Sequence, residues 1–304
     1  MHFYKAFGLS IHSELELTEL CQDHETQTQD LRIVVSNFSI PPLSETHIYR
    51  RKIRALFAVD DAGVAYLNWE GVANFKASNG NLLEVDPLTD DPELLSLFTV
   101  SEAIGLILYQ LNFFLLHASA VKIGNGAWCF TGEPGAGKST TAAAFIKAGG
   151  TLLSDDLTAI SFGADGAAFV VPAYPQLKIW DNTVSGLNYN RANLTPVTEG
   201  VNKFAYQPKE DFRHEKIRLK QVLFLHKNVS GEPDAPLPPM SVATESLANF
   251  PLPLGLLEGQ ALKEHFEDSF KCAKSAEMWT KERPEDFGKL EEWAREVFEK
   301  ETQD

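Results

Sequence analysis

The chain has 304 residues, and its 27 Lys and Arg against 42 Asp and Glu give a formal net charge of −15. Apolar residues make up 44% and charged residues 23%, a composition typical of a folded globular protein that excludes a disordered chain. The excess of negative charge repels phosphate backbones and anionic lipid, so we expect no nucleic-acid and no membrane partner. One local basic pocket for a nucleotide remains compatible with this charge.

The cysteines and the apolar segments indicate a cytoplasmic protein. Cys21, Cys129 and Cys272 are widely separated, and no CxxC or Cys/His cluster accompanies them, so neither a disulfide framework nor a zinc site is expected. The N-terminus lacks the basic region and long apolar run of a signal peptide. The longest apolar stretch, residues 103–116, is interrupted by polar residues and is too short to cross a bilayer.

Two regions are expected, a β-rich N-terminal region over residues 1–90 and a second domain over residues 91–304. The first contains β-type runs separated by turns at 60–63 and 79–80. The second opens with a predicted helix over 92–114, because acids and a proline stand at its start and its apolar residues are too dense for a solvated helix.

The rest of the second domain alternates predicted strands with predicted helices. Apolar runs bounded by glycine-rich turns predict strands, and apolar residues at helical spacing after 262 and after 287 predict two closing helices. The expected strands cover residues 118–123, 127–130, 151–154, 157–162, 167–171 and 221–226.

A glycine-rich loop carries the strongest chemical signal. Residues 132–139 match G-x-x-x-x-G-K-[ST] in full, after a predicted strand and before a predicted helix over 140–148. Such a loop points backbone N–H groups and a helix N-terminus at phosphate oxygens, while Lys138 adds a point charge and the Ser139 hydroxyl binds Mg²⁺. The alternative is a chance loop before an ordinary helix. The pattern predicts ATP and Mg²⁺ as ligands, with the nucleotide held by Gly132, Glu133, Pro134, Gly135, Ala136, Gly137, Lys138, Ser139 and Thr140.

Two adjacent acids, Asp155 and Asp156, begin 16 positions after Ser139, at the end of a predicted strand. A magnesium nucleotide needs one carboxylate at the end of a strand beside the phosphate loop. A second carboxylate could accept the proton of an attacking hydroxyl, which a kinase needs and a nucleotide switch does not. The alternative is a solvated strand end or a helix cap. The residues alone leave open which aspartate would have which role.

Other candidate residues have weaker signals. His117 lies among apolar residues, where a histidine of the core is the common alternative to a functional one. The run 174–180 mixes aromatic residues with one lysine and would either line a pocket or pack in the core. Lys203 and a basic stretch could reach a transferred phosphoryl group or form a solvated face. The basic stretch consists of Arg213, Lys216, Arg218 and Lys220.

The ordered combination of residues 117–121, 132–139 and 153–156 resembles the catalytic domain of HPr kinase/phosphorylase. More closely, it resembles the HPr-kinase-like proteins found beside peptide-maturation genes, including lasso-peptide kinases. The resemblance covers residues 115–160 and extends more loosely to about residue 226. It implies an α/β (α+β) fold: a P-loop kinase core of the HPr kinase/phosphoenolpyruvate carboxykinase type, with a β-rich N-terminal region and C-terminal helices.

The resemblance implies transfer of a phosphoryl group from ATP to a serine or other hydroxyl of a peptide or protein. Carried over to this sequence, it makes Asp156, His117 and Lys138 catalytic, with Asp156 as the base and His117 near the acceptor. Ser139 and Asp155 would bind the metal, although the sequence permits exchange of the two aspartates. Relatives assemble into oligomers, which leaves a homo-oligomer open.

One departure from HPr kinases limits what is carried over. The Glu-x-Arg-Gly signature that follows the aspartates in HPr kinases is absent, and residues 170–174 read Val-Val-Pro-Ala-Tyr in that neighbourhood. This difference counts against HPr recognition and against reverse phosphorolysis. Two other functions stay open: a nucleotide-binding regulatory or assembly ATPase without a phosphoryl acceptor, and ATP hydrolysis coupled to maturation of a partner.

Overall fold

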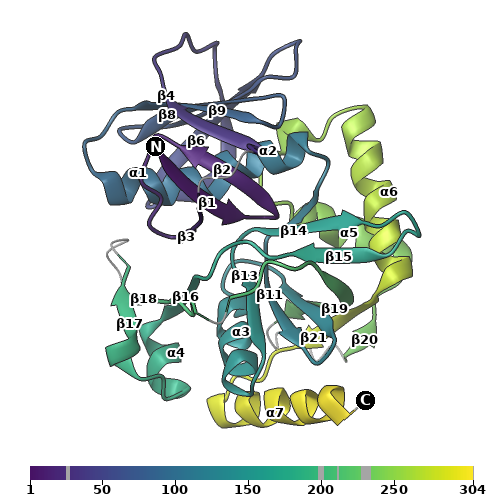
Figure 1. The fold of residues 1–304 in the computed structure, drawn as a ribbon. Coiled ribbons are helices and arrows are strands. Elements are labelled where there is room, and N and C mark those ends of the chain that lie inside the picture. The colour runs from purple at the N-terminus through teal and green to yellow at the C-terminus, as the bar shows by residue number, and fades with distance from the viewer. Residues whose placement is uncertain (25–27, 198–201, 211, 227–233, 304) are drawn as a thin grey trace. The chain divides into compact units, whose positions relative to one another are not determined.

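The computed structural model describes residues 1–304 except 25–27, 198–201, 211, 227–233 and 304. The chain combines large β-sheets with several helices, as expected for the α+β class (Figure 1). It divides into two compact units: unit 1 comprises Met1–Leu115 and Phe250–His265, and unit 2 comprises Leu116–Asn249 and Phe266–Asp304. This division differs from the expected boundary at residues 90/91, because the helical segment after residue 91 packs on the first sheet.

Unit 1 is built on a nine-stranded sheet in the order β3-β1-β2-β4-β9-β8-β7-β6-β5. Its neighbouring strands are antiparallel except for the parallel pairs β2–β4 and β4–β9. The predicted turns at 60–63 and 79–80 are confirmed, since they join β6 to β7 and β8 to β9. The strands are β1 (His2–Ala6), β2 (Leu9–Ser13), β3 (Cys21–Gln22), β4 (Leu31–Val35), β5 (Ser44–Arg50), β6 (Ile53–Val59), β7 (Ala65–Trp69), β8 (Ala73–Ser78) and β9 (Leu82–Pro87).

A helical segment packs on this sheet. It consists of α1 (Pro92–Phe98), a π-helical turn (Thr99–Ala103) and α2 (Ile104–Gln110). The single helix predicted over 92–114 is therefore wrong in two respects. Ser101 has non-helical backbone angles (φ −93°, ψ −116°), and the chain enters strand β10 (Phe114–Leu116) instead of continuing as helix.

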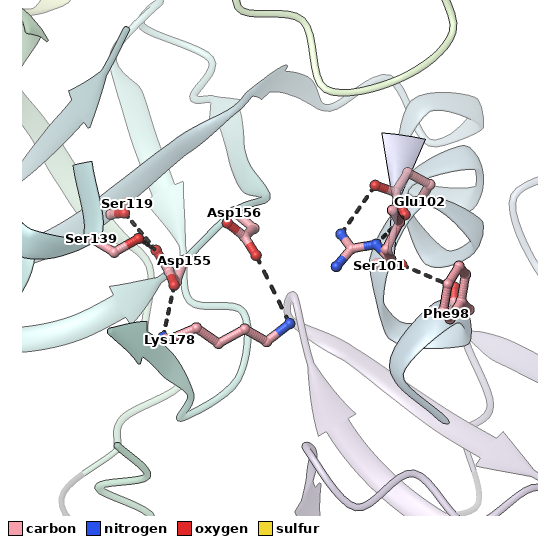
Figure 2. A network of polar contacts seen from close by, with 9 residues as sticks. Phe98, Ser101, Glu102, Ser119, Ser139, Asp155, Asp156 and Lys178 are labelled. Atoms are coloured by element: carbon pink, nitrogen blue, oxygen red, sulfur yellow. Dashed lines mark hydrogen bonds and ion pairs between the residues drawn. The ribbon is translucent and has the colours of Figure 1, made fainter. Parts of the chain in front are cut away.

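The same segment is fixed by polar and aromatic contacts within unit 1. The Asp91 carboxylate caps α1 by accepting hydrogen bonds from the backbone N–H groups of Glu93 and Leu94. The Glu102 carboxylate pairs with Arg50 at 3.1 Å, and Figure 2 shows Glu102 beside Ser101. Pro92–Gln110 is long and apolar enough to span a membrane by length and composition, with 72% of the window buried in the structure; buried core helices meet the same criterion.

The main sheet of unit 2 contains the strand order β14-β15-β19-β12-β11-β13, and β21 also pairs with β19. The strands predicted at 118–123, 127–130, 151–154, 157–162 and 167–171 are confirmed with small changes of boundary, and the one predicted at 221–226 starts earlier. The strands are β11 (Ala118–Ile123), β12 (Gly126–Thr131), β13 (Thr151–Ser154), β14 (Thr158–Phe162), β15 (Ala168–Val171), β19 (Ile217–His226), β20 (Ala235–Pro236) and β21 (Glu277–Glu282).

Strand direction determines which side chains meet at one edge of this sheet. β12 is parallel to β19, and β19 is parallel to β21. β11 is antiparallel both to β12 and to β13, so β12 and β13 run in the same direction. The carboxyl ends of β12, β13, β19 and β21 therefore lie at the same edge, where ligands commonly bind in α/β sheets.

Helix α3 (Lys138–Lys147) packs against this sheet and against the C-terminal helix α7 (Phe287–Gln303) (Figure 1). Small residues on α3 allow close packing, and Phe145 contacts Trp293 edge-on at 5.1 Å between ring centroids. The two predicted closing helices are confirmed as α6 (Gln260–Ser275) and α7.

Some elements of unit 2 were not predicted from the sequence. They include the strands β20 and β21, a three-stranded sheet in the order β16-β18-β17, and two short helices. Their bounds are β16 (Leu177–Trp180), β17 (Leu194–Pro196), β18 (Lys203–Tyr206), α4 (Asp181–Gly186) and α5 (Pro239–Ala248).

Candidate functional site

The glycine-rich loop follows β12 and leads directly into α3, in the order that the sequence predicts. Gly132, Gly135 and Gly137 all have positive φ angles, of 137°, 86° and 97°, which side-chain-bearing residues rarely adopt. A Cβ at Gly132 would also collide with the backbone oxygen of Leu225. The side-chain oxygen of Asn249 accepts a hydrogen bond from the Gly132 N–H at 3.1 Å and so fixes the start of the loop.

The remaining residues of the loop differ in exposure and contacts. Glu133, Pro134 and Gly135 form its exposed tip, whereas Ala136 is buried. The hydroxyl of Thr140 lies 2.9 Å from that of Thr183 on α4, which ties the first turn of α3 to that helix. The structure therefore brings all nine predicted nucleotide-binding residues to one loop and the helix turn that follows it.

Lys138 is the first residue of α3 and is only 9% exposed. Its Nζ donates to the backbone oxygen of Gly132 at 2.9 Å, so the ammonium group lies against the loop itself. Burial lowers the pKa of Lys138, while the charges of Asp156 and Asp155 act in the opposite direction. A buried ammonium with three donors at this place is suited to bind the oxygens of a phosphate chain.

Asp155 is 6% exposed and lies where β13 ends, at the same sheet edge as the loop. Its Oδ1 accepts hydrogen bonds from the hydroxyls of Ser119 at 2.5 Å and Ser139 at 2.9 Å (Figure 2). Its Oδ2 accepts one from the backbone N–H of Lys178 at 3.0 Å. Because Ser139 uses its proton on Asp155, the lone pairs of its hydroxyl oxygen are available to a cation.

Burial also shifts the titration of this carboxyl group. Burial and the charge of Asp156 raise the pKa of Asp155 to about 6, although its hydrogen bonds with Ser119, Lys178 and Ser139 favour the charged form. A cation bound beside it would favour ionisation.

Asp156 differs from its neighbour in backbone and exposure. Its φ of 64° is left-handed, a conformation that is uncommon outside glycine and that clusters at functional sites. Its side chain is 38% exposed, and its Oδ2 lies 3.9 Å from the Nζ of Lys178 (Figure 2). One carboxylate of the pair is therefore buried and held by three donors, while the other is accessible to solvent.

Two further lysines come from the small sheet. Lys178 on β16 belongs to the run 174–180 that the sequence singled out, and Lys203 on β18 is the isolated cation noted there. The Nζ of Lys203 lies 4.6 Å from the ring centroid of Trp180, and its charge helps to lower the pKa of Lys138. Lys178 and Lys138 thus bring positive charge to the two aspartates, and Lys203 adds a charge that acts on Lys138.

The predicted basic stretch has other contacts. Arg213 donates to the backbone oxygen of Glu210, Lys216 lies over the ring of Phe169, and Lys220 pairs with Glu301. Arg218 stands near the amino end of β19, opposite Phe169 on β15, and not at the edge that carries the loop. The solvated-face interpretation therefore fits these four residues better than a phosphate-binding one.

His117 is connected by its backbone to the residue that precedes the loop. Its N–H donates to the backbone oxygen of Asn249 at 2.7 Å, and the Thr131 hydroxyl donates to its carbonyl at 3.1 Å. Sequence reasoning missed Ser119 and Asn249. The alternation of side chains along a strand could have placed Ser119 with His117, whereas no local signal marks Asn249.

The donor set fits a magnesium ion better than a metal held by protein alone. Within the described ranges, no group of three or more His, Cys, Asp or Glu residues could hold a metal. Mg²⁺ is usually bound through one or two carboxylates, water and substrate phosphates, and Ser139 with Asp155 offers that pattern. Cys129 and Cys272 are buried and form no disulfide.

Comparisons with known proteins give a distant likeness. No protein-family model matches the sequence, and no curated protein matches it. One of the solved structures that match is the Hpr(Ser) kinase/phosphatase from Coxiella burnetii, at 20% sequence identity and a TM-score of 0.28. The match covers 40% of this chain and 73% of that chain.

Proposed function

We propose that the protein is an ATP-dependent kinase with a P-loop core of the HPr kinase type, which phosphorylates a serine or other hydroxyl of a peptide or protein. The observation that carries this proposal is the turn after β13, where buried Asp155 accepts the Ser139 hydroxyl and solvent-accessible Asp156 follows directly. A module that only binds nucleotide has no use for the second, accessible carboxylate.

The loop and Lys138 would hold the phosphates of ATP. Backbone N–H groups of such a loop and of the helix start that follows it bind phosphate oxygens, and Lys138 at the start of α3 supplies a cation. Ser139 and Asp155 would hold Mg²⁺, which when bound would neutralise charge on the outer phosphates. The Asp155 hydrogen bonds keep the Ser139 oxygen oriented for that role.

Asp156 is the better candidate for the general base. Both oxygens of Asp155 already accept hydrogen bonds, whereas Asp156 is accessible to an incoming acceptor. Asp156 would take the proton of the acceptor hydroxyl as its oxygen attacks the terminal phosphorus and the bond to the leaving diphosphate breaks. Lys138, Lys178 and Lys203 would stabilise the charge that develops on the transferred group.

His117 is proposed to contact the acceptor, because its backbone is fixed directly before the loop. The acceptor class, a peptide or protein that the cytoplasm supplies, follows from the resemblance to peptide-maturation kinases.

Phosphoryl transfer is tested with γ-labelled ATP, Mg²⁺ and serine-containing peptides, including precursor peptides from neighbouring genes. Wild-type protein should label a peptide, and Asp156→Asn should abolish labelling while it retains nucleotide binding. Asp165→Asn, at an exposed acid in the turn between β14 and β15, is the matched control and should label normally. Release of inorganic phosphate without any labelled acceptor would instead support the regulatory or assembly ATPase.

A further inference from the structure

Arg283 emerges at the same sheet edge as the phosphate loop, although 145 positions separate it from Lys138. It follows the last residue of β21, and β21, β19 and β12 run parallel. Its backbone N–H donates at 3.1 Å to the carbonyl of His226, the last residue of β19. The sheet therefore fixes the position of the Arg283 backbone relative to the loop.

The side chain of Arg283 lies against the last glycine of the loop. A Cβ built on Gly137 would lie 2.5 Å from the Nε of Arg283 and 2.6 Å from its Cδ. The glycine at this position thus leaves room for the arginine as well as permitting the positive φ of 97°. The guanidinium is in contact with the residue that caps α3, directly before Lys138.

Two of its nitrogens have no acceptor. The Nε and Nη1 atoms of Arg283 are buried and have no hydrogen-bond partner, and no salt bridge of Arg283 occurs in the part of the chain that the structure describes. Burial lowers the pKa of Arg283, and the charge of Glu285 acts in the opposite direction without a hydrogen bond to the guanidinium. Buried donors without an acceptor are unfavourable, and more so when they belong to a charged group. A guanidinium with two unsatisfied N–H donors beside this loop is suited to bind an anionic ligand that the loop also binds.

The strand order indicates which phosphate of a bound nucleotide would lie near Arg283. The aspartates follow β13, two strands from β12 on one side, whereas Arg283 follows β21, two strands from β12 on the other. In the proposed kinase the metal and the terminal phosphate lie on the side of Ser139 and Asp155. A phosphate chain that crosses the loop from there runs toward Arg283.

We infer that Arg283 binds the α-phosphate of the nucleotide, at the end of the phosphate chain nearest the nucleoside, and takes no part in stabilising the transferred group. The inference rests on the nucleotide site of the proposed function and adds a residue to it. It makes Arg283 a determinant of nucleotide affinity, and it predicts that ADP and ATP depend on this arginine to the same extent.

Titrations of Mg²⁺·ADP and Mg²⁺·ATP into wild type and Arg283→Gln provide the test. We expect the Kd of both nucleotides to rise about tenfold or more in the variant, as for loss of a charge-assisted hydrogen bond. The kcat at saturating ATP should stay within about threefold, because the transition-state contacts of the terminal phosphoryl are kept. An unchanged Kd for ADP, or a fall in kcat alone, would overturn the inference.

Stability in the absence of nucleotide separates ligand binding from a structural role. Because Arg283→Gln removes a half-buried charge with two unsatisfied donors, the variant should unfold at the same temperature as wild type or higher. A clear fall in that temperature would assign Arg283 to structure instead. Arg218→Gln, on the neighbouring strand β19 but away from the loop, is the matched control and should bind ADP like wild type.

The outcomes also separate this inference from the proposed function. A wild-type protein that binds ADP but labels no acceptor would contradict the proposed kinase activity. The Kd of ADP in wild type and in Arg283→Gln would still test the role of Arg283. A wild-type protein that fails to bind ADP would contradict both.

Discussion

The hydroxyl of Ser139 donates to the Oδ1 of Asp155 at 2.9 Å, which joins the first turn of α3 to the end of β13. This bond connects the glycine-rich loop to the acidic pair. The two meet because β11 is antiparallel to both β12 and β13, so that β12 and β13 end at the same edge of the sheet. Both partners offer oxygen atoms, the kind of ligand that Mg²⁺ prefers, and we propose them as its protein ligands. The predictions below start from this contact.

The first prediction concerns pH and the stability of the metal-free protein. The folded-state pKa of Asp155 is raised to about 6, above the ordinary value near 3.9 of an unfolded aspartate. The folded state therefore holds this proton more tightly, and the free energy of unfolding should fall as pH rises from about 4 to 6, by about 2–3 kcal/mol at most. Denaturant unfolding in EDTA across this pH range measures the effect.

The matched variant for this prediction is Asp155→Asn. An asparagine can accept from the Lys178 N–H and donate to the serine hydroxyls, so the variant should fold and lose this part of the pH dependence. If the unfolding free energies of the two proteins ran parallel from pH 4 to 7, the environment described for Asp155 would be wrong.

The second prediction concerns Ser119, which the sequence analysis did not select. Ser119→Ala removes a hydrogen bond to the ionised form of Asp155, so the pKa of Asp155 should rise further and binding of Mg²⁺ should weaken. At pH 7 we expect the Mg²⁺ concentration required for half-maximal ADP binding to increase about threefold to tenfold. Ser185→Ala, at an exposed serine of α4, should not change it.

The third prediction concerns the conformation of the phosphate loop. Gly132→Ala places a methyl group against the Leu225 carbonyl at a residue with a positive φ. The substitution should therefore distort the loop and lower the free energy of unfolding. Gly166→Ala is the control, since its φ is 79° but nothing lies within 4 Å of the added methyl group. The control should lose about 1–2 kcal/mol of stability and keep ADP binding. Gly132→Ala should lose more stability, and ADP binding with it; equal effects of the two variants would refute the steric argument.

The fourth prediction compares the two aspartates in catalysis. Asp156→Asn should lower kcat by about 100-fold or more while the Kd of ADP changes little, because only the proton acceptor is lost. Asp155→Asn should lower kcat and should also raise the Mg²⁺ concentration required for activity. Rapid-quench measurement of labelled peptide tests both variants, and the reverse pattern would exchange the roles of the two residues.

Local sequence patterns predicted the helices and strands of the candidate site more accurately than they predicted the neighbouring elements. The loop motif and the strands at β11, β12 and β13 follow from glycine spacing and short apolar runs, which are local signals. The helix expected over 92–114 is interrupted at Ser101, where the backbone leaves the helical region, and it ends at Gln110 before strand β10; apolar spacing reveals neither change.

Contacts between distant segments were out of reach of such patterns. Asn249 accepts a hydrogen bond from the Gly132 N–H, 117 positions away in the sequence. Arg283 lies against Gly137 and follows β21, a strand that was not predicted because its sequence is mostly polar. Lys203 could be named as an isolated cation, but only the pairing of β16 with β18 explains how it comes near Lys138. Sheet topology, which long-range packing decides, therefore completes the site.

A crystal structure with Mg²⁺ and a non-hydrolysable ATP analogue tests the nucleotide site most directly. We expect the phosphates on the N–H groups of the loop and on Lys138, the metal at Ser139, Arg283 at the α-phosphate, and Asp156 facing the terminal phosphate. An analogue bound elsewhere, or an Asp156 carboxylate turned away from the terminal phosphate, would contradict the proposed kinase site.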